Sequence, residues 1–240
     1  MYKIGIDVGS TYTKYCVMNN GKIESLFMEK TPVRQLEYFD KKISELKQSF
    51  PDAEIVSCGY GRKNIGAIRN INELTALAKG AYFISNENGA VLDIGGQDTK
   101  VIIQQEGQLK EFFINDKCAA GSGMFLINTL NLLNKKYENI SLDSGKNELN
   151  LSSVCAVFAQ TEIVELIANN IQEEKIINAV IHQILIKTKP LLDKIQGECF
   201  ILSGGMSQIN GINNFATKVT QKKCVTVKDG AYMSAIGCTL

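Results

Sequence analysis

The chain has 240 residues, of which 45% are hydrophobic and 21% charged, and its formal net charge is +1. This composition is typical of a globular protein large enough to bury one large core or two small ones. The near-neutral charge argues against a nucleic-acid-binding surface, and no apolar run approaches the ~20 residues that span a bilayer. The chain starts directly with a predicted strand and no signal peptide, so we expect a cytoplasmic protein that does not bind a membrane.

The first half of the chain is predicted to contain a hairpin, a helical region and a second hairpin. Asn72 is a plausible N-cap for the second helix of this half. A turn at 86–89 marks the expected boundary between a first domain, 1–86, and a second domain, 87–240. The predicted elements are a hairpin over 1–28, a helix over 35–50, a strand over 55–58, a helix over about 72–83 and a hairpin over 90–114.

The second half alternates helices with strands, which indicates an α/β layer structure. One helix is predicted to start at Ser152-Ser153, with Cys155 in or beside its first turn and with Ile163, Val164 and Ile167 facing inward. The other predicted elements are a loop of small residues over 115–123, a helix after it, a polar surface loop over 139–150, a long helix over about 173–195, strands over 200–202 and 224–227, and a short terminal helix.

A turn motif occurs twice in the chain. Residues 7–14 (DVGSTYTK) recur as residues 93–100 (DIGGQDTK), 86 positions further on. Each copy lies between two apolar runs, which predicts a strand, a tight glycine turn and a second strand. Glycines let backbone N–H groups approach an anion, and Mg²⁺ prefers few carboxylates together with phosphate oxygens. The repeat therefore predicts two phosphate-binding turns, although two purely structural hairpins are the alternative.

The residues expected to form this site are defined by the two turns and by a later Gly-Gly turn at the end of a strand. Asp7 and Asp93 are the expected Mg²⁺ ligands. The expected nucleotide-binding residues are Gly9, Ser10, Thr11, Thr13, Lys14, Gly95, Gly96, Asp98, Gly204, Gly205 and Met206. The lysine of each turn, Lys14 or Lys100, either contacts phosphate or is simply exposed.

These motifs resemble those of the ATPase superfamily that contains actin, Hsp70 chaperones and sugar kinases. Three further segments are similar to the activators of 2-hydroxyacyl-CoA dehydratases and the ATPase subunits of benzoyl-CoA reductase: residues 93–98, 115–123 (NDKCAAGSG) and 155–162 (CAVFAQTE). The resemblance covers nearly the whole chain. It implies two actin-like (ribonuclease H-like) α/β domains with ATP or ADP and Mg²⁺ in a cleft between them. It also implies that Glu73 is a candidate for positioning the attacking water, with Gln97 and Asp98 as alternatives.

The resemblance also implies a homodimer that bridges one [4Fe-4S] cluster through two cysteines of each subunit, and Cys118 and Cys155 are the matching positions. The residues agree with this interpretation. None of the seven cysteines forms a CxxC pair, and both positions lie near predicted helix N-termini, which favour thiolates and anionic clusters. Two ordinary buried thiols are the alternative. The other cysteines (Cys16, Cys58, Cys199, Cys224 and Cys238) are expected to be mostly small buried hydrophobes, and the single histidine, His182, to be structural.

The function implied by the resemblance is ATP-driven transfer of one low-potential electron to a partner iron–sulfur enzyme. The partner would be a 2-hydroxyacyl-CoA dehydratase or a related CoA-ester or double-cubane reductase, and the reductant a flavodoxin or ferredoxin. Two alternatives stay open. One is a small-molecule kinase of the same superfamily, which would leave the block around Cys118 without a role. The other is a nucleotide-dependent scaffold without redox chemistry.

Overall fold

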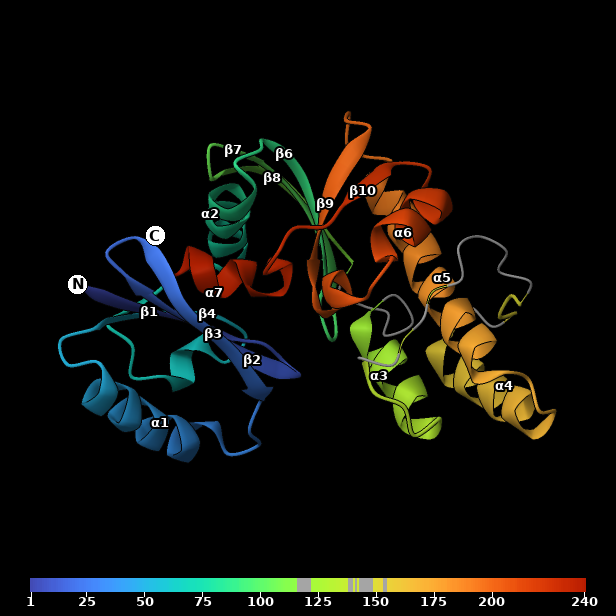
Figure 1. Cartoon of the computed structure of the whole chain (residues 1–240), viewed down its shortest axis with the longest axis horizontal. Coiled ribbons are helices and arrows are strands. Elements are labelled where there is room, and N and C mark those ends of the chain that lie inside the picture. The colour runs from blue at the N-terminus through green and yellow to red at the C-terminus, as the bar shows by residue number, and fades with distance from the viewer. Residues whose placement is uncertain (116–121, 138–139, 141, 143–148, 153–154) are drawn as a thin grey trace. The chain divides into compact units, whose positions relative to one another are not determined.

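The computed structural model describes residues 1–115, 122–137, 140, 142, 149–152 and 155–240 (Figure 1). By their internal contacts these residues form two compact units. The first unit comprises 1–88, 102–111 and 232–240, and the second comprises 89–101 and 112–231. Within the described part of the chain, no helix is long and apolar enough to cross a membrane. The expected division at 86/87 stays a prediction, but the return of residues 232–240 to the first unit was not anticipated.

The first unit is built on a five-stranded sheet of order β3-β2-β1-β4-β5. Strands β1, β2 and β3 form an antiparallel meander, whereas β4 and β5 run parallel to β1. Its strands are β1 (Tyr2–Val8), β2 (Tyr12–Asn19), β3 (Lys22–Lys30), β4 (Glu54–Gly59) and β5 (Arg69–Asn70), and its helices are α1 (Gln35–Ser49), the 3₁₀ turn η1 (Arg62–Asn64), α2 (Glu73–Ser85) and α7 (Met233–Gly237).

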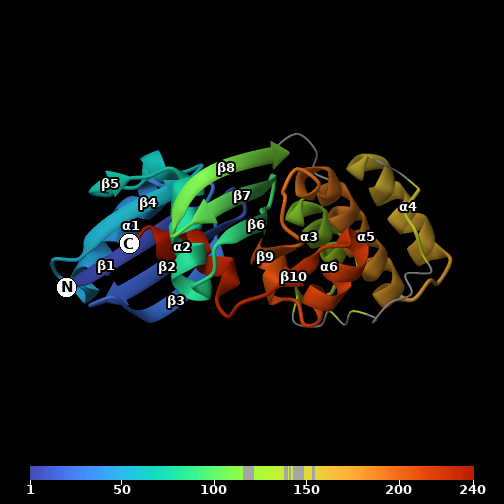
Figure 2. The same cartoon turned by 90° about the horizontal axis from the view of Figure 1, so that it is seen from above.

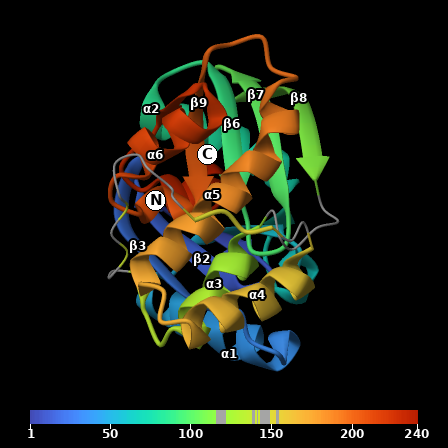
Figure 3. The same ribbon diagram turned by 90° about the vertical axis from the view of Figure 1, so that its right-hand side faces the viewer.

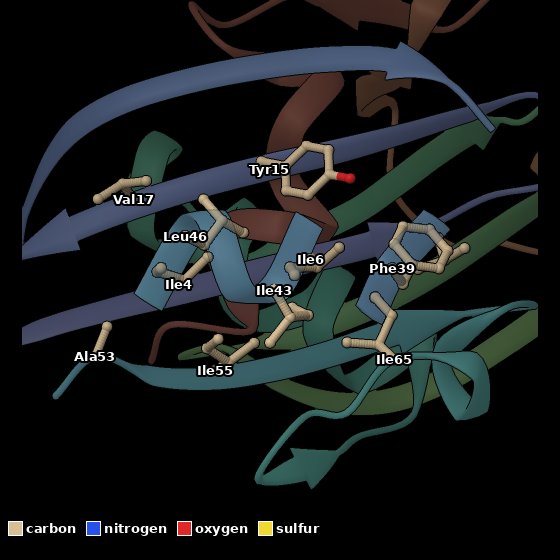
Figure 4. Close-up of a cluster of buried hydrophobic side chains, with 11 residues drawn as sticks. Ile4, Ile6, Tyr15, Val17, Phe39, Ile43, Leu46, Ala53, Ile55 and Ile65 are labelled. Carbon is tan, nitrogen blue, oxygen red and sulfur yellow. The ribbon is translucent and has the colours of Figure 1, made fainter. Parts of the chain in front are cut away.

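Alternation along these strands gives the sheet two apolar faces. On one face, side chains of β1, β2 and β4 pack against Phe39, Ile43 and Leu46 of α1 (Figure 4). The opposite face receives the alternate residues of β2, Cys16 and Met18, which pack against α7. Helix α1 therefore covers one face of the first sheet, and α7 covers the other.

Helix α7 lies unusually close to its neighbours in the first unit because glycines face it. A Cβ atom added at Gly5 of β1 would lie 1.9 Å from the carbonyl oxygen of Ala235. One added at Gly80 of α2 would lie 1.8 Å from that of Met233. The missing side chains thus let the α7 backbone pack directly on both a strand and a helix.

The other five-stranded sheet, of order β10-β9-β6-β7-β8 (Figure 2), belongs to the second unit except for residues 102–105 of β7 and 108–111 of β8, which group with the first. Strand β9 runs parallel to both of its neighbours, β6 and β10. Helices α3, α4 and α5 contact one another (Figure 3), and α5 also contacts α6. The elements are β6 (Gly89–Ile94), β7 (Thr99–Gln105), β8 (Gln108–Asn115), α3 (Gly123–Leu132), α4 (Ala156–Ala168), α5 (Glu173–Leu192), β9 (Cys199–Gly204), η4 (Gly205–Gln208), α6 (Ile212–Thr220), β10 (Lys223–Val225) and η5 (Gly230–Tyr232).

The duplicated hairpin is confirmed in both copies. After each glycine turn, the second and third strands are joined by a turn whose two central residues have positive φ angles. These are Asn20 and Gly21 in the first copy (49° and 78°) and Glu106 and Gly107 in the second (50° and 74°). Positive φ at both positions is the type I′ geometry that matches the twist of antiparallel strands. The α/β fold class is likewise confirmed.

Two expectations about side-chain burial were wrong. Val164 and Ile167 of α4, predicted to face inward, are 52% and 37% exposed, whereas Ile163 is buried as expected. Cys199 is exposed at the start of β9. Helix α4 also begins later than predicted, because Cys155 itself is the N-cap. Most of the predicted surface loop at 139–150 lies outside the described residues.

Candidate functional site

The first phosphate turn is centred on Asp7, at the carboxyl end of β1. The carboxylate is almost fully buried and lies in register with Lys14 on β2 and Cys58 on β4. The Cys58 thiol donates to Asp7 Oδ1 at 3.6 Å. Burial raises the pKa of Cys58 well above its ordinary value, and a hydrogen bond with Cys238 and the negative charges of Asp7 and Glu73 add to the shift. Cys58 is therefore a neutral donor, and both predicted carboxylates of this unit act on it.

The glycine turn after Asp7 is closed by a short chain of hydroxyl groups. Thr31 donates to the carbonyl oxygen of Gly9 at 2.8 Å, and its oxygen lies 3.0 Å from that of the buried Thr13. Thr13 is thus engaged inside the hairpin, and its phosphate role stays a prediction. The hydroxyl oxygen of Thr11 is buried without a hydrogen-bond partner among the described residues. An unsatisfied donor at this turn fits a phosphate oxygen as its partner.

A second loop, residues 59–62 (GYGR), packs against this turn. Gly59 has a φ of +87°, and a Cβ there would lie 2.5 Å from the carbonyl oxygen of Val8 and 2.7 Å from Asp7 Oδ1. Only glycine tolerates both the conformation and the approach. Arg62 donates to the carbonyl oxygen of Gly59 at 3.0 Å, and Tyr60 is 64% exposed. The loop thus supports the Asp7 carboxylate from behind and presents an aromatic ring to its surroundings.

The second phosphate turn differs from the first in its charges. The ammonium group of Lys100 lies 3.0 Å from Asp98 Oδ2 and 3.6 Å from Asp93 Oδ2, and the lysine side chain is only 3% exposed. Asp98 also closes the turn through its backbone, since its carbonyl oxygen accepts from the Gly95 N–H at 2.9 Å. Lys100 was expected either to contact phosphate or to be exposed, and its burial excludes exposure. Gln97 is exposed at the tip of this turn.

The second turn also holds the beginning of α3. The N–H groups of Gly123 and Met124 donate to the carbonyl oxygens of Gly95 and Gly96, at 2.8 and 3.0 Å. The first N–H groups of a helix have no partner within the helix. Here the turn supplies two acceptors, and it therefore fixes the start of the helix that follows the segment containing Cys118.

The late Gly-Gly turn lies beside the second phosphate turn, at the end of the parallel strand β9. Ile94 is in register with Gly204, whose φ is +86°, and a Cβ at Gly204 would lie 2.3 Å from the carbonyl oxygen of Ile94. A Cβ at Gly205 would meet no atom closer than the Tyr137 hydroxyl oxygen, at 3.8 Å. Met206 is buried. Gly204 is thus required by the strand contact, and Gly205 leaves space beside the turn.

Of the two candidate cluster cysteines, the structure describes only Cys155. Cys118 lies outside the described residues. Cys155 is an exposed free thiol and the N-cap of the 13-residue helix α4. This position places the thiol beside the first N–H groups of α4, whose partial positive charge suits an anionic ligand set. Across the described residues, no three His, Cys, Asp or Glu side chains form a group able to hold a metal ion.

The predicted residues therefore gather in two sets, one in each unit. Asp7, Gly9 and Thr11 form the first set, and the charge of Glu73 contributes to the raised pKa of Cys58 beside Asp7. Asp93, Gly95, Gly96 and Asp98 form the second, with Gly204 on the neighbouring strand. Sequence reasoning missed the contributions of Thr31 and of the Lys100 ion pairs. The pairing of Lys100 had one signal, since the second copy of the motif carries an acid, Asp98, where the first carries Tyr12.

Comparison with known proteins identifies the family that carries this arrangement. The model of the BadF/BadG/BcrA/BcrD ATPase family matches residues 4–240. The chain belongs to this ATPase family. Among its relatives, the 2-hydroxyisocaproyl-CoA dehydratase activator of Clostridioides difficile is 33% identical over 227 residues, which cover 88% of this chain and 84% of that protein.

Solved structures of activators share the fold of this ATPase. The activator of the 2-hydroxyisocaproyl-CoA dehydratase from Clostridium difficile, with bound ADPNP, matches with a TM-score of 0.86 and 27% identity over 100% of this chain and 93% of that chain. Component A of the (R)-2-hydroxyglutaryl-CoA dehydratase of Acidaminococcus fermentans matches with a TM-score of 0.84 and 28% identity, over 100% and 96% of the two chains.

Proposed function

We propose that this ATPase is an activator that delivers one electron at a time to a 2-hydroxyacyl-CoA dehydratase or a related CoA-ester reductase. In the proposal, a flavodoxin or ferredoxin reduces the chain, which acts as a homodimer bridging one [4Fe-4S] cluster. The observation that carries it is the exposed thiol of Cys155 at the N-terminus of α4, in a chain whose relatives include dehydratase activators.

The nucleotide part of the proposal rests on the two turns. Asp7 and Asp93 would hold Mg²⁺, the unsatisfied Thr11 hydroxyl would donate to a phosphate oxygen, and the space at Gly205 would admit the nucleoside. The bound ADPNP of the Clostridium difficile activator supports a nucleotide site in this fold. Glu73 and Gln97 are the proposed candidates for orienting the attacking water.

The cluster part rests on the chemistry of Cys155. Because the thiol of Cys155 is exposed, it can reach a ligand outside its own chain, and a cubane needs four thiolates. Two chains, each supplying Cys118 and Cys155, would provide them. When bound, the cluster would supply a one-electron redox centre, while the residues of this chain hold it and coordinate nucleotide.

The dimer part rests on the surface of α4. Phe158 and Val164 are 69% and 52% exposed, although a helix rich in apolar residues is normally covered. We infer that a second copy of this chain covers α4, since the neighbouring thiol needs a second copy to complete its ligand set. A Phe158→Glu variant should then shift the dimer towards monomer in light scattering, whereas Val33→Glu, at a fully exposed apolar residue of the first unit, should not.

Anaerobic purification followed by iron, sulfide and absorption measurements tests the cluster. The variants are Cys118→Ser and Cys155→Ser, with Cys199→Ser as the matched control, because Cys199 is also exposed but has no predicted role. We expect about four irons per dimer in the wild type and the control, and loss of the iron in both test variants. An iron-free dimer with ATPase activity that no variant alters would refute electron transfer.

A further inference from the structure

The two phosphate turns differ in the number of charges at their centres. Because the copies lie 86 residues apart, Asp98 of the second corresponds to Tyr12 of the first. The second turn thus contains two carboxylates, Asp93 and Asp98, whose side chains are 11% and 13% exposed, with the ammonium group of Lys100 in contact with both. Counting these three groups, the centre of the second turn carries a net charge of about −1.

A buried lysine at this place has a definite electrostatic consequence. Unlike a surface ion pair, a pair at this depth is only weakly screened by salt. Its ammonium cancels one of two negative charges that would otherwise attract any divalent cation and repel phosphate. Lys100 is committed to these contacts, at 3.0 and 3.6 Å, and is oriented inward.

We propose that Lys100 is a positioning residue that fixes Asp93 and Asp98 in place and sets the charge of the second turn, so that the turn favours metal bound together with nucleotide over metal alone. This inference rests on the proposed role of Asp93 in holding Mg²⁺. It assigns a specific role to a lysine that is buried and paired with both carboxylates rather than exposed.

Three variants change this charge in steps. Lys100→Met lowers it to about −2, and Asp98→Asn raises it to about 0 without changing the shape of the side chain. The double variant Lys100→Met/Asp98→Asn restores about −1. The matched control is Lys135→Met, which removes an ion pair with Glu173 (2.6 Å) elsewhere in the second unit. Circular dichroism and thermal unfolding establish that each variant is folded.

Two ligands are measured separately on each purified protein. Binding of Mn²⁺, as a stand-in for Mg²⁺, is followed by electron paramagnetic resonance of the free ion, and binding of ADPNP is followed by calorimetry in EDTA. Lys100→Met should bind Mn²⁺ at least about tenfold more tightly and ADPNP more weakly, because a unit charge next to a divalent ion changes its affinity by this factor or more. Asp98→Asn should shift both in the opposite directions, and the double variant should lie near the wild type.

Shifts of the Mn²⁺ and ADPNP affinities in opposite directions distinguish the charge effect from damage to the fold, because a damaged fold would bind both ligands more weakly. If either single variant changes both affinities in the same direction, or changes neither, the role assigned to Lys100 is wrong while the proposed function stands. If the wild-type chain binds ADPNP neither in EDTA nor with Mg²⁺, the proposed function itself fails, and the inference fails with it.

Discussion

The contact between α2 and α7 predicts that Gly80→Ala will destabilise the first unit. A Cβ atom at Gly80 would lie 1.8 Å from the carbonyl oxygen of Met233 and 3.0 Å from the backbone nitrogen of Gly237. Both neighbours are backbone atoms, so no side-chain rotation relieves the clash. Helix α7 would have to move, and it also contacts β1, β2 and β4. One added methyl group therefore disturbs the whole α7 face of the sheet.

The size of the effect follows from two opposing contributions. Overpacking of a close-packed interior costs about 1–3 kcal/mol, and a backbone neighbour places this site in the upper part of that range. Alanine in place of glycine inside a helix stabilises by about 0.5–1 kcal/mol. The net loss is about 1–2 kcal/mol, which for a chain of this length lowers Tm by about 2–8 °C.

Thermal unfolding followed by circular dichroism measures this loss. The control is Gly66→Ala in the same unit, since a Cβ at Gly66 would meet no atom within 4 Å. We expect the control to stay within about 0.5 kcal/mol of the wild type. A Gly80→Ala protein as stable as the wild type, or more stable, would refute the packing argument for α7.

Three further predictions concern single residues. Gly123→Ala places a Cβ 3.0 Å from the carbonyl oxygen of Gly95. The hydrogen bond from the Gly123 N–H to that oxygen is then strained, and ADPNP binding should weaken about twofold to tenfold. Gly197→Ala, whose Cβ would have its nearest atom at 3.8 Å, should leave binding unchanged. Mass spectrometry after brief alkylation of the cluster-free protein should find Cys155 modified and Cys224 unmodified, because burial raises the pKa of Cys224 to about 12. Burial lowers the pKa of His182, so the unfolded chain binds this proton more tightly; stability should fall as pH drops below the unfolded pKa of about 6.5. Tm measured between pH 7 and 5 should fall less in His182→Gln, and an equal fall would contradict this assignment.

The hairpins and the α/β class were predictable because their signals are local. Each glycine turn lies between apolar runs, and Asn20-Gly21 marks a tight turn without reference to the rest of the chain. The N-cap at Asn72 was predictable for the same reason, and its side chain does accept from the N–H of Leu74, at 2.8 Å. Features that depend on a few neighbouring residues were therefore accessible from the sequence alone.

The features that were missed depend on contacts distant in sequence. Val164 and Ile167 are apolar, and the sequence does not distinguish an apolar face covered by its own chain from one left exposed. The contact between Cys58 and Asp7 joins strands whose pairing no local pattern specifies. The ion pairs of Lys100 depend on burial, which periodicity along a short strand does not reveal. In each case the deciding partner lies elsewhere in the fold.

The return of α7 to the first unit has a consequence for how the chain folds. Residues 233–240 cover strands β1 and β2, which are synthesised more than two hundred residues earlier. Lys79 of α2 also donates to the carbonyl oxygen of Leu240, at 2.9 Å. During synthesis, the α7 face of the first sheet must stay uncovered while the second unit emerges from the ribosome, because domains form as their residues become available. All residues of the second unit lie within 89–231, so they are synthesised before the first unit is complete. Strands β1 and β2 are made first, but α7, which packs on them, is made last.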